Sequence, residues 1–240
     1  VLVPKDIAAG ERRPAILAAH GHGNGKDDVC RIDHGESDRV DKIEELNYGY
    51  AVELVQRGYV VIAPDWRGFG ERRLGGNLPP RDSCNVLFNK GMLFGVNLLT
   101  LNVWDAMQSV TYLQSRPEVD PDRIGCVGLS YGGTMTLFTT AMDERIKIAV
   151  PSGALNVMQE RIRGRYSCGA QVIPGLLLYG DVPEIGSLIA PRPCIWETGS
   201  RDKLIVPGWK ERAIERMQRA YAASGKPGHL QIHKFEGGHR

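Results

Sequence analysis

Short runs of consecutive apolar residues recur along the chain, with helical segments between them. Ala15–Ala19 and Tyr59–Ala63 are two such runs, and Ile43–Arg57 lies between them with apolar residues at helical spacing. A strand that is apolar at every position is covered on both faces, as strands of a parallel sheet are. Parallel neighbours need a crossover, which the helical segments supply. The pattern predicts the α/β class, with a mostly parallel central sheet and helices on both faces.

The same alternation continues to the end of the chain. Further strands are predicted at 123–129, 146–150, 194–198 and 230–235, and helices at about 86–116, 134–142 and 209–223. Two stretches interrupt it, at about 72–85 and 152–190, and both are rich in Gly, Pro and polar residues. We therefore expect a single domain over residues 1–240, with loop or lid excursions at these two places.

Composition limits the partners that such a chain can have. The net charge is +2 and no basic stripe interleaved with aromatic residues occurs, so we expect no nucleic-acid partner. No apolar run reaches the ~18 residues of a membrane span, and we expect no membrane partner. The five cysteines form no disulfide framework and no CxxC zinc motif, and no signal peptide is recognisable; a cytoplasmic location is the expectation. The oligomeric state is left open.

The segment Gly128-Leu129-Ser130-Tyr131-Gly132-Gly133 matches the G-x-S-x-G motif. It lies between a predicted strand and a predicted helix, which is the context that this motif requires. Glycines on both sides allow a tight turn that exposes the serine hydroxyl. The helix N-terminus and the backbone N–H of Tyr131 can then stabilise a developing oxyanion. Ser130 is the predicted nucleophile.

A serine nucleophile needs a base, and the base needs an acid to orient it. Asp202 follows the predicted strand that ends at Thr198, and His239 follows the last strand, in the chain order Ser, acid, His. We expect Asp202 to be the acid and His239 to be the base. The competing residues are two acids and two histidines, Asp181, Glu197, His229 and His233.

The loop after the first strong strand reads His20-Gly21-His22-Gly23. In a strand–Ser–helix architecture, this loop supplies the second oxyanion donor, and the backbone N–H of His22 is the expected group. Four residues farther on could suggest a metal site, but their spacing matches no standard ligand set and favours a solvated loop: Asp27, Asp28, Asp33 and His34. We expect no metal and no cofactor. Asp65 and Arg67, at another strand end, are expected to hold loops together.

These motifs together resemble the α/β-hydrolase superfamily, and most closely its branch of dienelactone hydrolase-like and acetyl xylan esterase-like serine esterases. The segments that carry this likeness are 20–25, 65–70, 120–133 and 188–193. The resemblance implies the α/β-hydrolase fold and ester hydrolysis through an acyl-enzyme, without cofactor or metal. Two features differ from the branch: dienelactone hydrolases proper use cysteine where this chain has Ser130, and the deacetylases usually carry Gln where it has Tyr131.

The expected function is therefore that of a serine carboxylesterase acting on a small-molecule ester. Neither excursion supplies the long amphipathic helix of a lipase lid, so short acyl groups such as acetyl are expected. Two alternatives remain open. Ser130-Tyr131-Gly132-Gly133 also looks like the catalytic domain of the prolyl oligopeptidase family, which would make the chain a peptidase. A non-catalytic hydrolase fold used as a binding module is the other.

Overall fold

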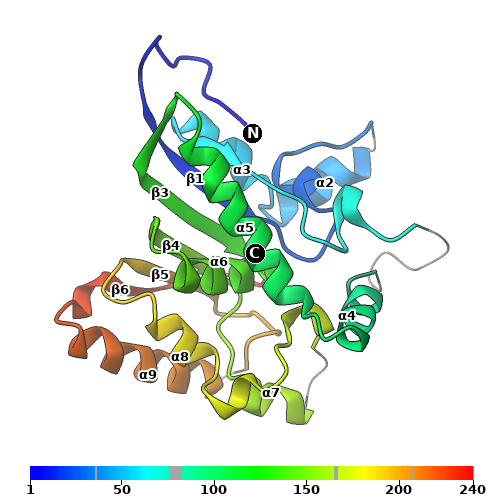
Figure 1. Cartoon of the computed structure of the whole chain (residues 1–240), viewed down its shortest axis with the longest axis vertical. Coiled ribbons are helices and arrows are strands. Elements are labelled where there is room, and N and C mark those ends of the chain that lie inside the picture. The colour runs from blue at the N-terminus through cyan, green and yellow to red at the C-terminus, as the bar shows by residue number, and fades with distance from the viewer. Residues whose placement is uncertain (36, 76–82, 165–166, 207, 240) are drawn as a thin grey trace.

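The computed structural model describes residues 1–35, 37–75, 83–164, 167–206 and 208–239. The described residues form a six-stranded sheet in the order β2-β1-β3-β4-β5-β6, and every neighbouring pair in it is parallel. The strands are β1 (Arg13–Ala19), β2 (Val60–Ile62), β3 (Val119–Leu129), β4 (Ile146–Ser152), β5 (Cys194–Gly199) and β6 (Leu230–Phe235). All six predicted strands are present, and the predicted α/β-hydrolase fold is confirmed (Figure 1).

Nine α-helices lie in the described part of the chain. They are α1 (Lys26–Val29), α2 (Ser37–Glu45), α3 (Tyr50–Gln56), α4 (Ser83–Leu93), α5 (Leu98–Gln114), α6 (Tyr131–Met142), α7 (Met158–Gly164), α8 (Val182–Ser187) and α9 (Trp209–Ala223). Figure 1 shows α5 and α6 lying on the sheet beside β3 and β4, and α8 beside α9.

The sheet has an apolar layer on each face, because consecutive strand residues point to opposite sides. Leu17 and Ala19 belong to the large cluster that α5, α6 and α9 complete, whereas Ala18 belongs to a smaller cluster with α1 and α3. The same alternation divides β2, where Val61 faces the smaller cluster. Coverage of both faces explains why Ala15–Ala19 of β1 and the whole of β2 are apolar without interruption.

Two predicted helices are each interrupted. The helix expected over 43–57 is α2 and α3, separated by a turn at Asn47, whose φ is 53°. A left-handed residue cannot continue a right-handed helix. The helix expected up to Arg116 is α4 and α5, and Asn97 caps the second by accepting a hydrogen bond from the Thr100 N–H (3.1 Å). The turn residues Asn47 and Asn97 are the local causes.

The two predicted excursions contain short elements. Residues 76–82 of the first and 165–166 of the second lie outside the described residues. The described part of the second contains α7, α8 and the 3-10 turns η2 (Gly169–Gln171) and η3 (Leu176–Leu178). Among the described residues no single helix is both long and apolar enough to cross a membrane; α4 and α5 pass that test only as a pair, bent by 104°.

Candidate active site

Ser130 occupies a sharp turn between β3 and α6. Its φ of 63° and ψ of −120° lie outside the regions that a serine ordinarily adopts. The turn is stabilised on both sides: the Ser130 N–H donates to the Ser152 carbonyl (2.9 Å), and the Ser130 carbonyl accepts from the Thr134 N–H (3.1 Å). The helix begins immediately after the serine, three residues earlier than predicted. The first turn of α6 therefore lies next to the hydroxyl group.

Two glycines allow β1 to pass close to this turn. A Cβ atom added to Gly132 would lie 1.8 Å from the Ala19 carbonyl oxygen, and one added to Gly128 would lie 2.5 Å from the same atom. Both contacts are with backbone that the sheet fixes in place. The G-x-S-x-G spacing is thus explained by the packing of the turn against the end of β1.

Asp202 and His239 come together at the ends of β5 and β6. His239 Nδ1 lies 2.7 Å from Asp202 Oδ2, and the other carboxylate oxygen accepts from the Leu204 N–H (2.8 Å). The Asp202 side chain is only 1% exposed. If Nδ1 donates its proton to this carboxylate, Nε2 is left as the acceptor. Within the described chain, that Nε2 is buried and has no hydrogen-bond partner.

The competing acids and histidines are engaged elsewhere. Asp181 is buried and caps two helices, because its carboxylate accepts from the backbone N–H groups of Met158, Gln159 and Val182 at 2.6–2.9 Å. Glu197 and His233 face each other across β5 and β6 at 3.5 Å. None of these, nor His229, lines the cavity that contains Ser130 and His239.

His22 lies beside the serine turn in the loop that follows β1. Its ring packs on Phe69 and on the Tyr131 ring, with centroid distances of 5.4 and 5.2 Å. A Cβ atom added to Gly21 would lie 3.3 Å from the Ser130 Cβ, which shows how closely this loop approaches the turn. The Tyr131 hydroxyl is buried and accepts from Asn102 Nδ2 (2.9 Å), and burial raises the pKa of that phenol. The two residues expected to offer oxyanion N–H groups are therefore neighbours.

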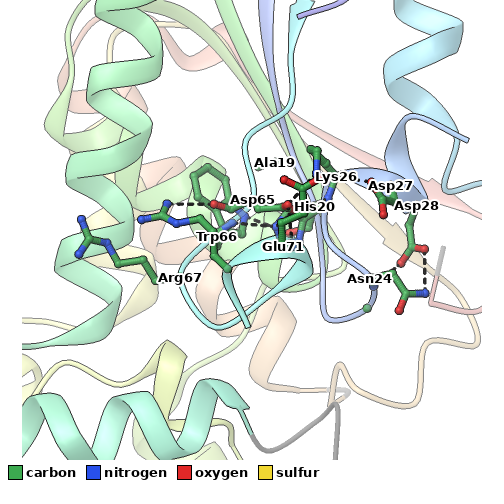
Figure 2. Close-up of polar contacts among 12 residues, drawn as sticks. Ala19, His20, Asn24, Lys26, Asp27, Asp28, Asp65, Trp66, Arg67 and Glu71 are labelled. Carbon is green, nitrogen blue, oxygen red and sulfur yellow. Dashed lines mark hydrogen bonds and ion pairs between the residues drawn. The ribbon is translucent and has the colours of Figure 1, made fainter. Parts of the chain in front are cut away.

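His20 links this loop to the segment at Trp66 through its hydrogen bonds (Figure 2). Its ring is 1% exposed; Nδ1 donates to the Gly21 carbonyl (2.8 Å) and Nε2 accepts from the Trp66 N–H (3.0 Å). The Trp66 indole N–H in turn donates to the His20 carbonyl (3.2 Å). Burial lowers the pKa of His20 to about 4, in agreement with a ring nitrogen that accepts a hydrogen bond.

Asp65 ties the loops after β1 and β2 together, as the sequence predicted. Its carboxylate accepts from the Lys26 backbone N–H (2.6 Å), the Lys26 Nζ (3.0 Å) and the Glu71 N–H (3.1 Å) (Figure 2). Arg67 has the same kind of role, because its guanidinium forms two bonds to Asp105 on α5, at 2.8 and 2.9 Å. Neither residue lines the cavity.

The acidic loop residues that could have suggested a metal site contact other residues of the same loop. Asp28 accepts from the Asn24 N–H (2.7 Å), Asp27 contacts the ring of His34 (2.9 Å), and Asp33 accepts from the Gly35 N–H (3.0 Å). In the described part of the chain, the side chains of metal-ligating types that come close together are three others, His22, Cys84 and Cys168.

Ser130 and His239 share a cavity of about 690 Å³. Among the described residues no carboxylate lines it. Its polar wall is formed by side chains that sequence reasoning did not select, because they come from the two excursions and the loop after β1: Asn24, Arg73, Asn156, Arg161 and Gln171. Arg73 also donates to the Gly23 carbonyl (2.7 Å) and Arg161 to the Leu204 carbonyl (3.1 Å). No local motif identifies such residues, since only the folding of distant loops brings them together.

Comparisons with known proteins show what this chain is similar to. The sequence model of the family "Acetyl xylan esterase (AXE1)" matches residues 38–157, half of the chain. A curated protein of Bacillus subtilis, "Putative hydrolase YtaP", is 30% identical over 234 residues, which cover 94% of this chain and 73% of that protein.

Solved structures show the same fold. A putative acetyl xylan esterase from Bacteroides fragilis has a TM-score of 0.80 at 22% identity, over 97% of this chain. The match spans 61% of that protein, so this chain corresponds to less than two thirds of its length. A glucuronoyl esterase from Teredinibacter turnerae has a TM-score of 0.62 at 21% identity, over 100% of this chain and 69% of that one. The chain belongs to the acetyl xylan esterase family of ester hydrolases.

Proposed function

We propose that this protein is a serine esterase that removes short acyl groups, acetyl above all, through an acyl-enzyme intermediate. The observation that carries the proposal is the shared cavity: Ser130 on a strained turn and His239, which is paired with Asp202, both line it. A nucleophile, a base and an orienting acid are the parts that acyl transfer requires.

In the proposed mechanism, Ser130 Oγ attacks the ester carbonyl carbon while His239 Nε2 accepts the hydroxyl proton. Asp202 holds the ring in the required tautomer and stabilises the imidazolium. The backbone N–H groups of His22 and Tyr131 donate to the oxyanion. The alcohol leaves with the proton from His239. Water then attacks the acyl-enzyme by the same route and releases the carboxylic acid.

The alcohol portion of the substrate is proposed to be a carbohydrate. Asn24, Asn156 and Gln171 offer amide donors and acceptors of the kind that hydroxyl groups bind. One of the similar proteins is described as a putative acetyl xylan esterase, and that name refers to an ester whose alcohol portion is a polysaccharide.

A panel of p-nitrophenyl esters from acetyl to decanoyl tests the acyl preference. We expect kcat/KM to be highest for acetyl to butyryl esters. The reason is that polar side chains form part of the cavity wall, where a long apolar acyl chain would gain little from burial. If each added methylene were buried in apolar surroundings, at about 0.8 kcal/mol each, kcat/KM would rise about fourfold per methylene. A steady rise through decanoyl would contradict the proposal.

The panel needs two further arms. Ser130→Ala should lose on the order of a million-fold in kcat, with an unchanged circular dichroism spectrum, whereas Ser224→Ala at the end of α9 should match the wild type. An aminoacyl p-nitroanilide tests the peptidase alternative. Faster cleavage of the anilide than of the acetyl ester would favour a peptidase, and inactivity of the wild type on all substrates would favour a binding module.

A further inference from the structure

Two cysteines far apart in the sequence meet beside the cavity. Cys84 lies in the first turn of α4, and Cys168 immediately precedes η2. Their Sγ atoms are 3.0 Å apart, and the residues are 1% and 6% exposed. Cys168 lines the cavity that contains Ser130. The mechanism proposed above uses neither thiol.

The neighbouring residues fix the two segments against each other. The Gly169 N–H donates to Asn85 Oδ1 (2.8 Å), so the residue after each cysteine bonds to the residue after the other. Gly169 also lies against the Phe88 ring, where an added Cβ atom would be 2.3 Å from Cδ1. The approach of the two sulfurs is therefore held by contacts on adjacent residues and does not depend on the thiols alone.

A histidine adjoins the pair. The ligand atoms of His22, Cys84 and Cys168 all lie within 4.8 Å of one another. The hydrogen bond from Cys168, together with the nearby His22 ring, lowers the pKa of Cys84 to about 5. A thiolate is the reactive form of cysteine, both as a nucleophile and toward oxidants.

The spacing of the sulfurs distinguishes two uses of such a group. Zinc holds thiolate sulfurs at about 2.3 Å in tetrahedral geometry, which keeps two of them roughly 3.8 Å apart. A disulfide brings them to about 2.05 Å. At 3.0 Å the pair is closer than zinc ligation would set it and needs about 1 Å of approach to bond.

We propose that Cys84 and Cys168 are a modification site, at which a peroxide forms a reversible disulfide that joins α4 to η2 and fixes this wall of the cavity. The Cys84 thiolate attacks a peroxide oxygen and becomes a sulfenic acid, with release of hydroxide. Cys168, whose pKa is raised by its hydrogen bond to Cys84, then attacks the sulfenic sulfur as the thiol, and its proton leaves with the displaced hydroxyl group as water. The two thiols give up two protons and two electrons, and hydrogen peroxide becomes two waters.

The remaining cysteines serve as internal controls. Cys126 and Cys194 are buried in strands β3 and β5, and burial raises the pKa of each to about 12. Cys30 is partly buried, and burial raises its pKa to about 11. These three thiols should remain reduced under conditions that oxidise the pair.

The test compares the wild type with Cys84→Ser, Cys168→Ser and the control Cys30→Ser, before and after mild hydrogen peroxide. The wild type and Cys30→Ser should each lose two thiols, with a mass decrease of two hydrogen atoms and a disulfide peptide that links residues 84 and 168. Their Tm should rise by about 5–10 °C, because the cross-link closes a long loop, and dithiothreitol should reverse the change. Neither Cys84→Ser nor Cys168→Ser should show these changes.

Three results would overturn the proposal. One is retention of all five thiols in the wild type after peroxide treatment. Another is a disulfide that maps to any other pair. The third is one zinc ion per purified wild-type chain that both Cys84→Ser and Cys168→Ser lack, which would identify a metal site with His22. All readouts are independent of esterase activity, so they stand apart from a failure of the proposed function.

Discussion

At the scale of single residues, two buried aspartates show how partners decide what a carboxylate can do. As whole residues, Asp181 and Asp202 are 3% and 6% exposed. Both carboxylate oxygens of Asp181 accept hydrogen bonds from backbone N–H groups at the starts of α7 and α8. One carboxylate oxygen of Asp202 instead contacts the His239 ring. The two aspartates are buried to a similar extent, so burial does not distinguish them. Their hydrogen-bond partners do, because Asp202 has an oxygen that contacts a histidine ring.

This difference predicts two distinct defects. Asp202→Asn should lower kcat by about 10⁴, because the amide favours the wrong tautomer of His239, with little change in Tm. Asp181→Asn should leave kcat of the folded enzyme close to wild type but lower the free energy of unfolding by about 1–2 kcal/mol, because it weakens two helix caps. Steady-state kinetics and urea unfolding of both variants check this. Exchanged phenotypes would show that the acid is misassigned.

His20 gives a pH dependence of stability whose sign follows from its lowered pKa. The unfolded chain takes up a proton near the ordinary pKa of about 6.5, whereas the folded chain does so only near 4. The contribution of neutral His20 to the free energy of unfolding is therefore fully present above pH 6.5. It should decline by about 3 kcal/mol as the pH falls to 4.

Urea unfolding of the wild type and of His20→Gln between pH 4 and 7.5 isolates that contribution. Gln can accept the Trp66 N–H bond but does not titrate. The stability advantage of the wild type over His20→Gln should shrink toward acid pH. A constant difference between wild type and His20→Gln would contradict the account.

At the scale of elements, the serine turn depends on the absence of a side chain at Gly132. An added methyl group would meet the Ala19 carbonyl at 1.8 Å, and neither β1 nor α6 can move away without loss of sheet or helix bonds. Gly132→Ala should therefore cost about 3 kcal/mol or more in the free energy of unfolding.

The matched control is Gly164→Ala at the end of α7, where an added Cβ atom meets nothing within 4 Å. It should change stability by less than about 1 kcal/mol. Thermal and urea unfolding measure both variants. Wild-type stability in Gly132→Ala would show that the turn tolerates a side chain and that the close packing is not required.

The strands could be predicted from the sequence and the helix interruptions could not, for physical reasons. A strand covered on both faces must be apolar throughout, and that signal is local. The α4–α5 break is set by the Asn97 cap, and its helical pattern continues on both sides. An asparagine can be a helix N-cap or a residue on the exposed face of a continuous helix. The spacing of apolar residues alone therefore does not tell one long helix from two shorter ones.

At the scale of the whole molecule, parallel topology is what made the catalytic candidates predictable. Strand ends β3, β5 and β6 lie at one edge of the sheet, so Ser130, Asp202 and His239 could be selected by their place after strands. The residues of the cavity wall could not be predicted in this way. Arg73 and Cys168 reach the site from the excursions, whose paths depend on tertiary contacts that no periodicity encodes.

The most direct test of the central claim is covalent labelling with a fluorophosphonate, followed by peptide mass mapping. The wild type should be labelled at Ser130 alone, in a one-to-one ratio that parallels the loss of esterase activity. Ser130→Ala should not react, and Asp202→Asn should react far more slowly. Label on another residue, or an active enzyme that resists labelling, would contradict the account.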